Sequence, residues 1–267
     1  MASDPLFLTT AIEAVVRAGD IQMAHVGRAI QIEKKGTIDL VTEVDLAVER
    51  AFREMIAERF PDHQILAEEL GGAETAPPGP CWVFDPLDGT TNYAHGVPIF
   101  CASLALEIGG VAELAAVYDP NRRELFTAER GVGAFLNGRP LRVSEAATLI
   151  DALLVTGFPY TVHARIDDLV GLFAAFMKRS RAVRRLGSAA IDLCWVAAGR
   201  FDGFWECELK PWDMSAGALI VAEAGGRVTT TSGEAFTSRQ GSVVASNGRI
   251  HDAMIEVIGG FRASGRH

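Results

Sequence analysis

The strongest constraint on the fold is a change in hydrophobic pattern along the chain. Apolar side chains first recur at helical spacing, over residues 5–34 and again over 42–60, where Thr42 and Asp45 resemble a capping box. Short apolar runs between loops rich in Gly and Pro then predict strands. From about residue 150, strand and helix patterns alternate. This order predicts one α/β domain with two halves, 1–150 and 151–267.

The expected elements follow from the same patterns. Helices are expected over residues 5–34, 42–60, 163–179, 188–198, 212–224 and from 251 onward. Strands are expected over residues 64–67, 82–84, 100–108, 111–118, 124–129, 134–136, 152–155, 181–186, 201–205, 227–230 and 242–245. Between two of these strands, Asn137-Gly138 predicts a two-residue turn.

The composition allows a large core and argues against several partners. Of 267 residues, 49% are hydrophobic, and a chain of this length buries about 70–75% of its unfolded surface. The formal net charge of −9 argues against direct nucleic-acid binding and against an anionic membrane surface. The four cysteines form no C-x-x-C pair and lack zinc spacing. With no signal peptide and no apolar run of about 18 residues, we expect a soluble cytoplasmic protein without membrane contact.

The segment from Asp85 to Thr91 carries the clearest chemical signal. It follows an apolar strand, so both of its aspartates are expected at that strand's carboxyl end, where ligands of α/β sheets gather. Gly89 allows close approach of backbone to a ligand, and Thr90 and Thr91 can cap a following helix whose N–H groups face an anion. Two carboxylates at this spacing suit one or two hard cations. The alternative is a surface Asp-Gly turn.

Further acidic residues, the pair Glu68-Glu69 and the single Asp45 and Asp213, have ordinary explanations when taken one at a time. Glu68 and Glu69 follow a strand and could be solvated, whereas Asp45 and Asp213 stand at helix starts, where the helix dipole favours an acid. Taken together, Glu68, Asp85, Asp88 and Asp213 form a carboxylate cluster at strand or helix ends that would repel itself without a cation. Oxygen ligands suit Mg²⁺, and Mg²⁺ suits phosphate. We therefore expect metal-assisted phosphate hydrolysis, in which one cation acidifies a water and another stabilises the leaving oxygen.

These segments resemble the inositol monophosphatase family. The first signature is Asp85-Pro86-Leu87-Asp88-Gly89-Thr90-Thr91-Asn92, and the second is Trp212-Asp213-Met214-Ser215-Ala216-Gly217, running on to Glu223-Ala224-Gly225-Gly226. Two upstream blocks, Asp39-Leu40-Val41-Thr42 with Asp45 and Ala67-Glu68-Glu69, match in the expected order. The resemblance spans about residues 5–260.

The resemblance implies a five-layer α-β-α-β-α sandwich of the inositol monophosphatase/fructose-1,6-bisphosphatase type, two or three Mg²⁺ ions, inhibition by lithium, and a homodimer. The implied metal ligands are Glu68, Asp85, the Leu87 carbonyl, Asp88 and Asp213. The implied catalytic residues are Asp45, Glu68 and Thr90. The implied substrate-binding residues are Glu68, Leu87, Asp88, Gly89, Thr90, Gly187, Ser188, Ala189, Glu206 and Asp213. Lys34 matches a lysine on a mobile loop.

The leading hypothesis is a phosphatase acting on a small phosphate monoester, myo-inositol 1-phosphate. Glu206 can pair with vicinal hydroxyls, which favours this alcohol. Histidinol phosphate, fructose 1,6-bisphosphate and 3′-phosphoadenosine 5′-phosphate stay open as alternatives with the same chemistry. Arg184 and Arg185 are the only paired arginines near a matched block that could receive a second phosphate. A different alternative is regulation, because some bacterial members of the family bind transcription machinery through protein contacts.

Overall fold

The structure is a computed structural model that describes residues 4–72 and 75–263. Its helices are α1 (Pro5–His25), α2 (Glu43–Arg59), α3 (Thr90–Ala94), α4 (Ile166–Met177), α5 (Ala189–Ala197), α6 (Pro211–Glu223) and α7 (His251–Ala263). An eight-stranded sheet contains β3 (Gln64–Ala67), β4 (Gly71–Gly72), β5 (Pro80–Asp88), β6 (Cys101–Ile108), β7 (Val111–Asp119), β8 (Glu124–Glu129), β9 (Gly133–Leu136) and β10 (Arg139–Pro140). A five-stranded sheet contains β11 (Leu153–Thr156), β12 (Ala182–Arg184), β13 (Gly203–Cys207), β14 (Arg227–Thr229) and β15 (Ser242–Ser246). A separate two-stranded ribbon pairs β1 (Ile32–Lys34) with β2 (Leu40–Thr42).

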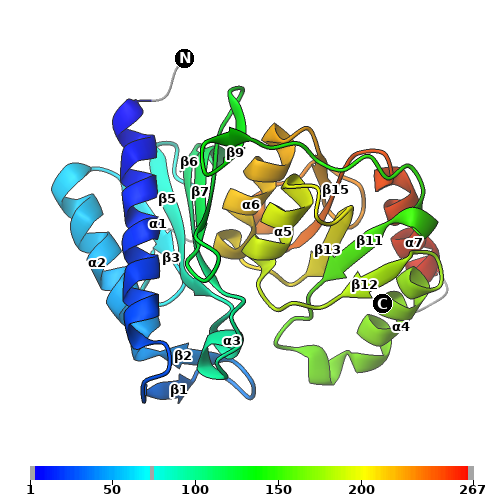
Figure 1. Ribbon diagram of the computed structural model, residues 1–267, viewed down its shortest axis with the longest axis horizontal. Coiled ribbons are helices and arrows are strands. Elements are labelled where there is room, and N and C mark those ends of the chain that lie inside the picture. Colours follow the sequence, from blue (N-terminus) through cyan, green and yellow to red (C-terminus); the bar gives the residue numbers. More distant parts are fainter. Residues whose placement is uncertain (1–3, 73–74, 264–267) are drawn as a thin grey trace.

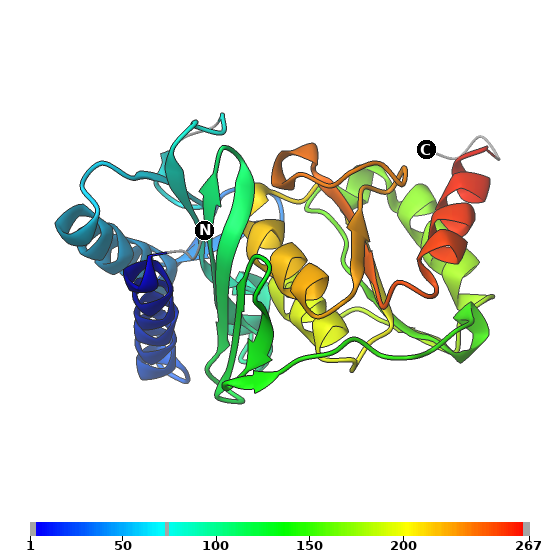
Figure 2. The ribbon, with the colours of Figure 1, turned by 90° about the horizontal axis from the view of Figure 1, so that it is seen from above.

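Helices and sheets alternate through the molecule in five layers. Helices α1 and α2 cover the outer face of the eight-stranded sheet, and α5 and α6 lie between the two sheets (Figure 1). Helices α4 and α7 cover the outer face of the five-stranded sheet, as the view from above shows (Figure 2). The predicted α-β-α-β-α sandwich is therefore confirmed.

Parallel neighbours occur in both sheets, and they matter for the site. The eight-stranded sheet has the order β10-β9-β8-β7-β6-β5-β3-β4 and is antiparallel except where β3 runs parallel to β5. In the five-stranded sheet, of order β12-β11-β13-β15-β14, strand β11 runs parallel to both β12 and β13. The carboxyl ends of parallel neighbours meet at one edge of a sheet, so residues that follow them come together.

The eight-stranded sheet is buried on both faces. Along β5, Trp82 and Phe84 pack toward α1 and α2, whereas Cys81 and Val83 pack toward α5 and α6. This alternation is the period of two expected for a strand. Because both faces are covered by helices, central strands such as β6 are buried along almost their whole length and read as nearly continuous apolar runs in the sequence.

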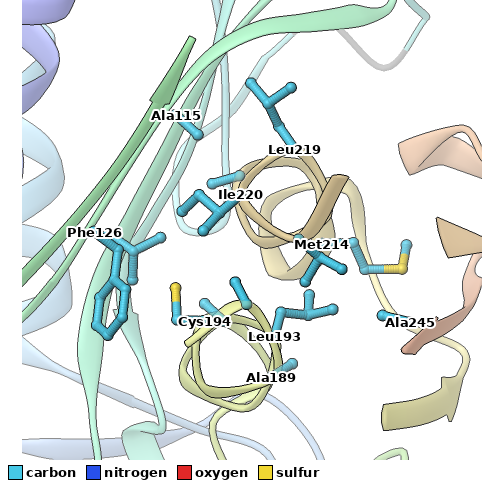
Figure 3. Packing of buried hydrophobic residues seen from close by; sticks show 14 of the residues in the cluster. Ala115, Phe126, Ala189, Leu193, Cys194, Met214, Leu219, Ile220 and Ala245 are labelled. Atoms are coloured by element: carbon cyan, nitrogen blue, oxygen red, sulfur yellow. The ribbon is translucent and has the colours of Figure 1, made fainter. Parts of the chain in front are cut away.

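The central helices fill the space between the sheets. Leu193 and Cys194 of α5 and Ile220 of α6 pack between Phe126 of the eight-stranded sheet and Ala245 of the five-stranded sheet (Figure 3). Helices α5 and α6 approach closely at Gly217 of α6, where an added Cβ would lie 2.6 Å from Leu193 Cβ. Cys101 and Cys194 are fully buried in this core.

The first helix is shorter than the predicted range of residues 5–34. Helix α1 ends at His25 because Val26 is extended and Gly27 adopts a left-handed φ of +76°. Residues 32–34, which the prediction placed in the helix, instead form β1 and pair with β2. Other local predictions hold: Thr42 and Asp45 form the capping box of α2. The Asn137-Gly138 turn has positive φ at both residues, as the two-residue hairpin requires.

In the part of the chain that the structure describes, no helix is both long enough and apolar enough to cross a membrane.

Candidate active site

The predicted metal ligands gather in one cavity of about 500 Å³ between the two sheets' strand ends. Because Ala67 of β3 pairs with Phe84 of β5, Glu68 and Asp85 are neighbours just beyond that pair. Asp88 ends β5, and Asp213 comes from the first turn of α6. All four side chains line the cavity, together with Leu87.

Each aspartate of the cluster is oriented by a hydrogen bond. The Leu87 N–H donates to Asp85 Oδ1 at 2.9 Å, and the Lys210 N–H donates to Asp213 Oδ2 at 2.7 Å. Asp88 Oδ2 accepts from Ser188 Oγ at 2.5 Å and from the N–H of the second residue of α5 at 2.8 Å. These donors hold one oxygen of each carboxyl and thereby fix the direction of the other.

The cluster is electrostatically costly by itself. Burial is the main reason that the pKa of Asp85 lies well above its usual value, and the charges of Glu68, Asp88 and Asp213 raise it further. Burial also raises the pKa of Glu68 to about 8, although the Lys35 ammonium, 3.1 Å from Glu68 Oε1, opposes that shift. The donors of this cluster are oxygens, and a divalent cation would relieve their repulsion, so the donor set fits Mg²⁺.

Lys35 supplies a positive charge to the same side of the cavity. Its ammonium also lies 2.5 Å from Glu69 Oε1. Among the residues that the structure describes, no three Cys, His, Asp or Glu side chains are already arranged as the ligands of a metal ion. Lys34, which the resemblance matched to a loop lysine, is an exposed residue of β1, whereas the neighbouring Lys35 lines the cavity.

A second buried acid lies behind the cluster. Thr90 Oγ1 donates toward Asp45 Oδ1 at 3.2 Å and toward the Leu87 carbonyl at 2.9 Å, so its single proton is shared between two acceptors. The N–H and hydroxyl of Thr42 donate to Asp45 Oδ2. Burial raises the pKa of Asp45, and the hydrogen bonds from Thr42 lower it. The structure thus brings together the predicted Asp45–Thr90 pair.

Gly89, not a threonine, caps the short helix α3. It has a left-handed φ of +98°, and an added Cβ would lie 2.8 Å from the Ile99 carbonyl oxygen. The expectation that Thr90 and Thr91 cap the helix was therefore wrong, because Thr90 is already its first residue. That position turns the Thr90 hydroxyl toward Asp45.

The other end of the cavity comes from α5 and the five-stranded sheet. Gly187, Ser188 and Ala189 form the start of α5, with Ser188 as its N-cap, and all three line the cavity. Glu206, in β13, is buried, and burial raises its pKa to about 8 while Arg185 lowers it. The structure therefore brings all the predicted substrate-binding residues into one cavity.

Gly157 and Asp192 line this end of the cavity and were not predicted. Because Thr156 pairs with Trp205 in parallel register, Gly157 stands beside Glu206, and a Cβ there would lie 2.0 Å from Glu206 Oε2. Gly157 therefore provides the space that the Glu206 carboxyl occupies. Its only signal in the sequence is its place directly after a predicted strand.

Comparison with known proteins identifies the family. The chain matches the inositol monophosphatase family over residues 5–259, and it belongs to that family. It is 44% identical over 253 residues to an inositol-1-monophosphatase of Synechocystis sp., covering 94% of this chain and 88% of that protein. It is 43% identical over 257 residues to the Nus factor SuhB of Pseudomonas aeruginosa, covering 94% and 95%.

Solved structures agree with this assignment. Inositol monophosphatase from Anabaena (Nostoc) sp. matches with a TM-score of 0.87 and 40% identity, covering 96% of each chain. An IMPase/NADP phosphatase complexed with Mg²⁺ and phosphate matches with a TM-score of 0.78 and 27% identity, covering 91% of this chain and 90% of that one. The fold is thus that of the inositol monophosphatases, and its relatives include both inositol monophosphatases and SuhB proteins.

Proposed function

We propose that the protein is a Mg²⁺-dependent phosphomonoesterase that hydrolyses myo-inositol 1-phosphate. The observation that carries the proposal is the single cavity that contains the acid cluster at one end and the buried Glu206 at the other. A phosphate ester that spans this cavity has its phosphate at the acids and its alcohol at Glu206.

Glu68, Asp85, the Leu87 carbonyl, Asp88 and Asp213 would hold the Mg²⁺ ions, of which we expect two or three. Bound there, Mg²⁺ would supply charge neutralisation for the phosphate and a lowered pKa for water. Lithium inhibition is an expected property of the same site.

The chain's own residues would orient the reactants and move one proton. Glu68 would hold the attacking water, whose proton would pass to the Thr90 hydroxyl while Thr90 passes its own proton to Asp45. A buried carboxylate whose pKa is raised is a better base than an exposed one, and Asp45 has this property. Backbone N–H groups of Gly89 and Thr90 would bind the phosphate oxygens.

The charges around the alcohol end favour a monophosphate. Arg185 is a cation at this end of the cavity, and Glu206 and Asp192 offset its charge. A second phosphate would meet these carboxyls, which disfavours fructose 1,6-bisphosphate and 3′-phosphoadenosine 5′-phosphate. The hydroxyls of inositol can instead donate to Glu206, while residues Gly187, Ser188 and Ala189 would contact the polyol beside it.

The test is phosphate release with Mg²⁺ from four esters: inositol 1-phosphate, histidinol phosphate and the two bisphosphates named above. We expect the highest kcat/KM for inositol 1-phosphate and loss of activity on chelation. A preference for another ester would leave the proposed mechanism standing and refute inositol 1-phosphate as the substrate. If no ester is hydrolysed, the proposal that the protein is a phosphatase is refuted.

A second candidate function is a role as a Nus factor, which the 43% identity to SuhB of P. aeruginosa favours. The two functions can be separated with Asp88→Asn, because Asp88 belongs to the proposed metal site. If the variant lacks phosphatase activity but still supports growth in place of the wild-type gene, a role independent of catalysis is favoured. A homodimer is a further expectation, to be checked by sedimentation.

A further inference from the structure

Asp192 is a buried carboxyl that the mechanism above does not use. It is 1% exposed, lies on α5 and lines the cavity. Its Oδ1 is enclosed and accepts no hydrogen bond from any residue that the structure describes. Leaving such a group without a partner costs free energy, so a buried carboxyl at the wall of a cavity calls for a donor from the molecule that enters the cavity.

The position of Asp192 along α5 fits the size of a ring. Its N–H donates to the Ser188 carbonyl at 3.0 Å, and the Ser188 hydroxyl contacts Asp88 at 2.5 Å. Four residues of helix advance about 6 Å, so Asp192 lies one helical turn beyond the residue that joins α5 to the acid cluster. That distance is comparable to the width of a six-membered ring with its hydroxyl groups.

The charged neighbours of Asp192 are Glu206, Asp88 and Arg185. The Arg185 guanidinium lies against Gly187, where an added Cβ would be 2.6 Å from one of its terminal nitrogens. One guanidinium therefore faces carboxyls from two elements, α5 and β13. Hydroxyl groups can hydrogen-bond to all of these, because a hydroxyl both donates and accepts.

We propose that Asp192 is a second substrate-binding residue for the alcohol, and that together with Glu206 it binds the hydroxyls of a cyclic polyol phosphate. The proposal rests on the proposed function, because it needs a substrate whose alcohol carries hydroxyls. It adds a residue on α5 to the binding surface that β13 provides. Selectivity for hydroxylated alcohols is then shared between two elements of the fold.

The test compares kcat/KM for inositol 1-phosphate with kcat/KM for phenyl phosphate, whose alcohol has no further hydroxyl. In Asp192→Leu, which keeps the side chain's approximate size, we expect the ratio to fall about tenfold through loss of the hydrogen bonds. In Asp192→Asn, which keeps an acceptor and adds a donor, we expect a smaller fall, of about threefold. The inhibition constant of myo-inositol should rise in the same order.

Asp119→Asn is the matched control, because Asp119 is equally buried but hydrogen-bonds Asn121 and Arg122 outside the cavity. It should leave the ratio unchanged. A wild-type-like ratio in Asp192→Leu would overturn the proposal and leave the proposed function standing. If the leucine variant does not fold, a wild-type-like ratio in Asp192→Asn together with unchanged inhibition by myo-inositol would do the same. If the wild-type protein itself shows no preference for inositol 1-phosphate over phenyl phosphate, the role of Asp192 and the proposed function are both refuted.

Discussion

Replacing Gly157 by alanine should damage recognition of the alcohol without touching the chemistry at the phosphate. The new Cβ would lie 2.0 Å from Glu206 Oε2 and 2.3 Å from Glu206 Cδ, which is far inside van der Waals contact. Gly157 follows β11 and is buried, and Glu206 belongs to a paired strand, so the backbone on both sides is held. The carboxyl must therefore rotate away.

The size of the effect follows from the hydrogen bonds that Glu206 would make. A hydrogen bond to a charged group contributes about 1.5–3 kcal/mol, and each 1.4 kcal/mol is a factor of about ten. Losing one such bond should therefore lower kcat/KM for inositol 1-phosphate by about 10- to 150-fold. For phenyl phosphate the same substitution should change kcat/KM by less than about threefold, because no hydroxyl is lost.

The assay is steady-state phosphate release from both esters, with Gly259→Ala as the control. Gly259 is an exposed residue of α7, and an added Cβ there meets nothing within 4 Å. This control should behave like the wild type on both esters. Equal losses of kcat/KM for both esters in Gly157→Ala, or no loss for either, would refute the reasoning.

Three further predictions concern the acid cluster and the core. Asp45→Asn should lower kcat by about 100-fold or more with little change in KM, because the acceptor of the Thr90 proton is lost; an unchanged kcat would contradict this. Asp213→Asn should lower kcat by at least about 100-fold, yet leave the free energy of urea unfolding without Mg²⁺ unchanged or higher, because it removes a charge that burial destabilises. Burial lowers the pKa of His251 to about 4, so between pH 6.5 and 4 the unfolded chain binds the proton more readily than the folded chain. The free energy of unfolding therefore decreases as the pH is lowered through this range, by about 3 kcal/mol in all. Above pH 6.5 this contribution is complete. Between pH 4 and 6.5, the free energy of urea unfolding of His251→Gln should depend less on pH than that of the wild type, and the same pH dependence in both proteins would refute the prediction.

Much of the acid end of the site could be predicted from sequence because it depends on local order. A strand followed by an acid puts that acid at the strand's carboxyl end, and this holds for both Glu68 and Asp85. The only long-range information needed is that β3 and β5 are parallel neighbours. The capping box of Thr42 and Asp45 is likewise a contact between residues three apart.

The segment after α1 was harder to predict for the opposite reason. Residues 26–34 carry enough apolar side chains to continue a helical pattern, and the break at Gly27 depends on one left-handed residue. The pairing of β1 with β2 gives this segment its structure, and the residues of β1 are all exposed, with no period-two alternation in burial. Without that ribbon, nothing in the sequence distinguishes Lys34 from Lys35.

Gly157 and Asp192 could not be predicted because their roles depend on tertiary contacts. The residues Gly157 and Glu206 are distant in sequence and become neighbours only through the register between β11 and β13. Asp192, in the first turn of α5, looks like an acid favoured by the helix dipole. Only the cavity shows that its carboxyl is enclosed and without a hydrogen-bond donor among the described residues.

Both ends of the cavity use the same device, a pair of parallel strands whose carboxyl ends meet. In the eight-stranded sheet, β3 and β5 bring Glu68 beside Asp85; in the five-stranded sheet, β11 and β13 bring Gly157 beside Glu206. Helix α5 joins the two ends, because its N-cap Ser188 bonds to Asp88. A change confined to β11 or β13 should therefore alter which alcohol binds while the acids keep their positions, whereas a change that moves the start of α5 should disturb both binding and chemistry.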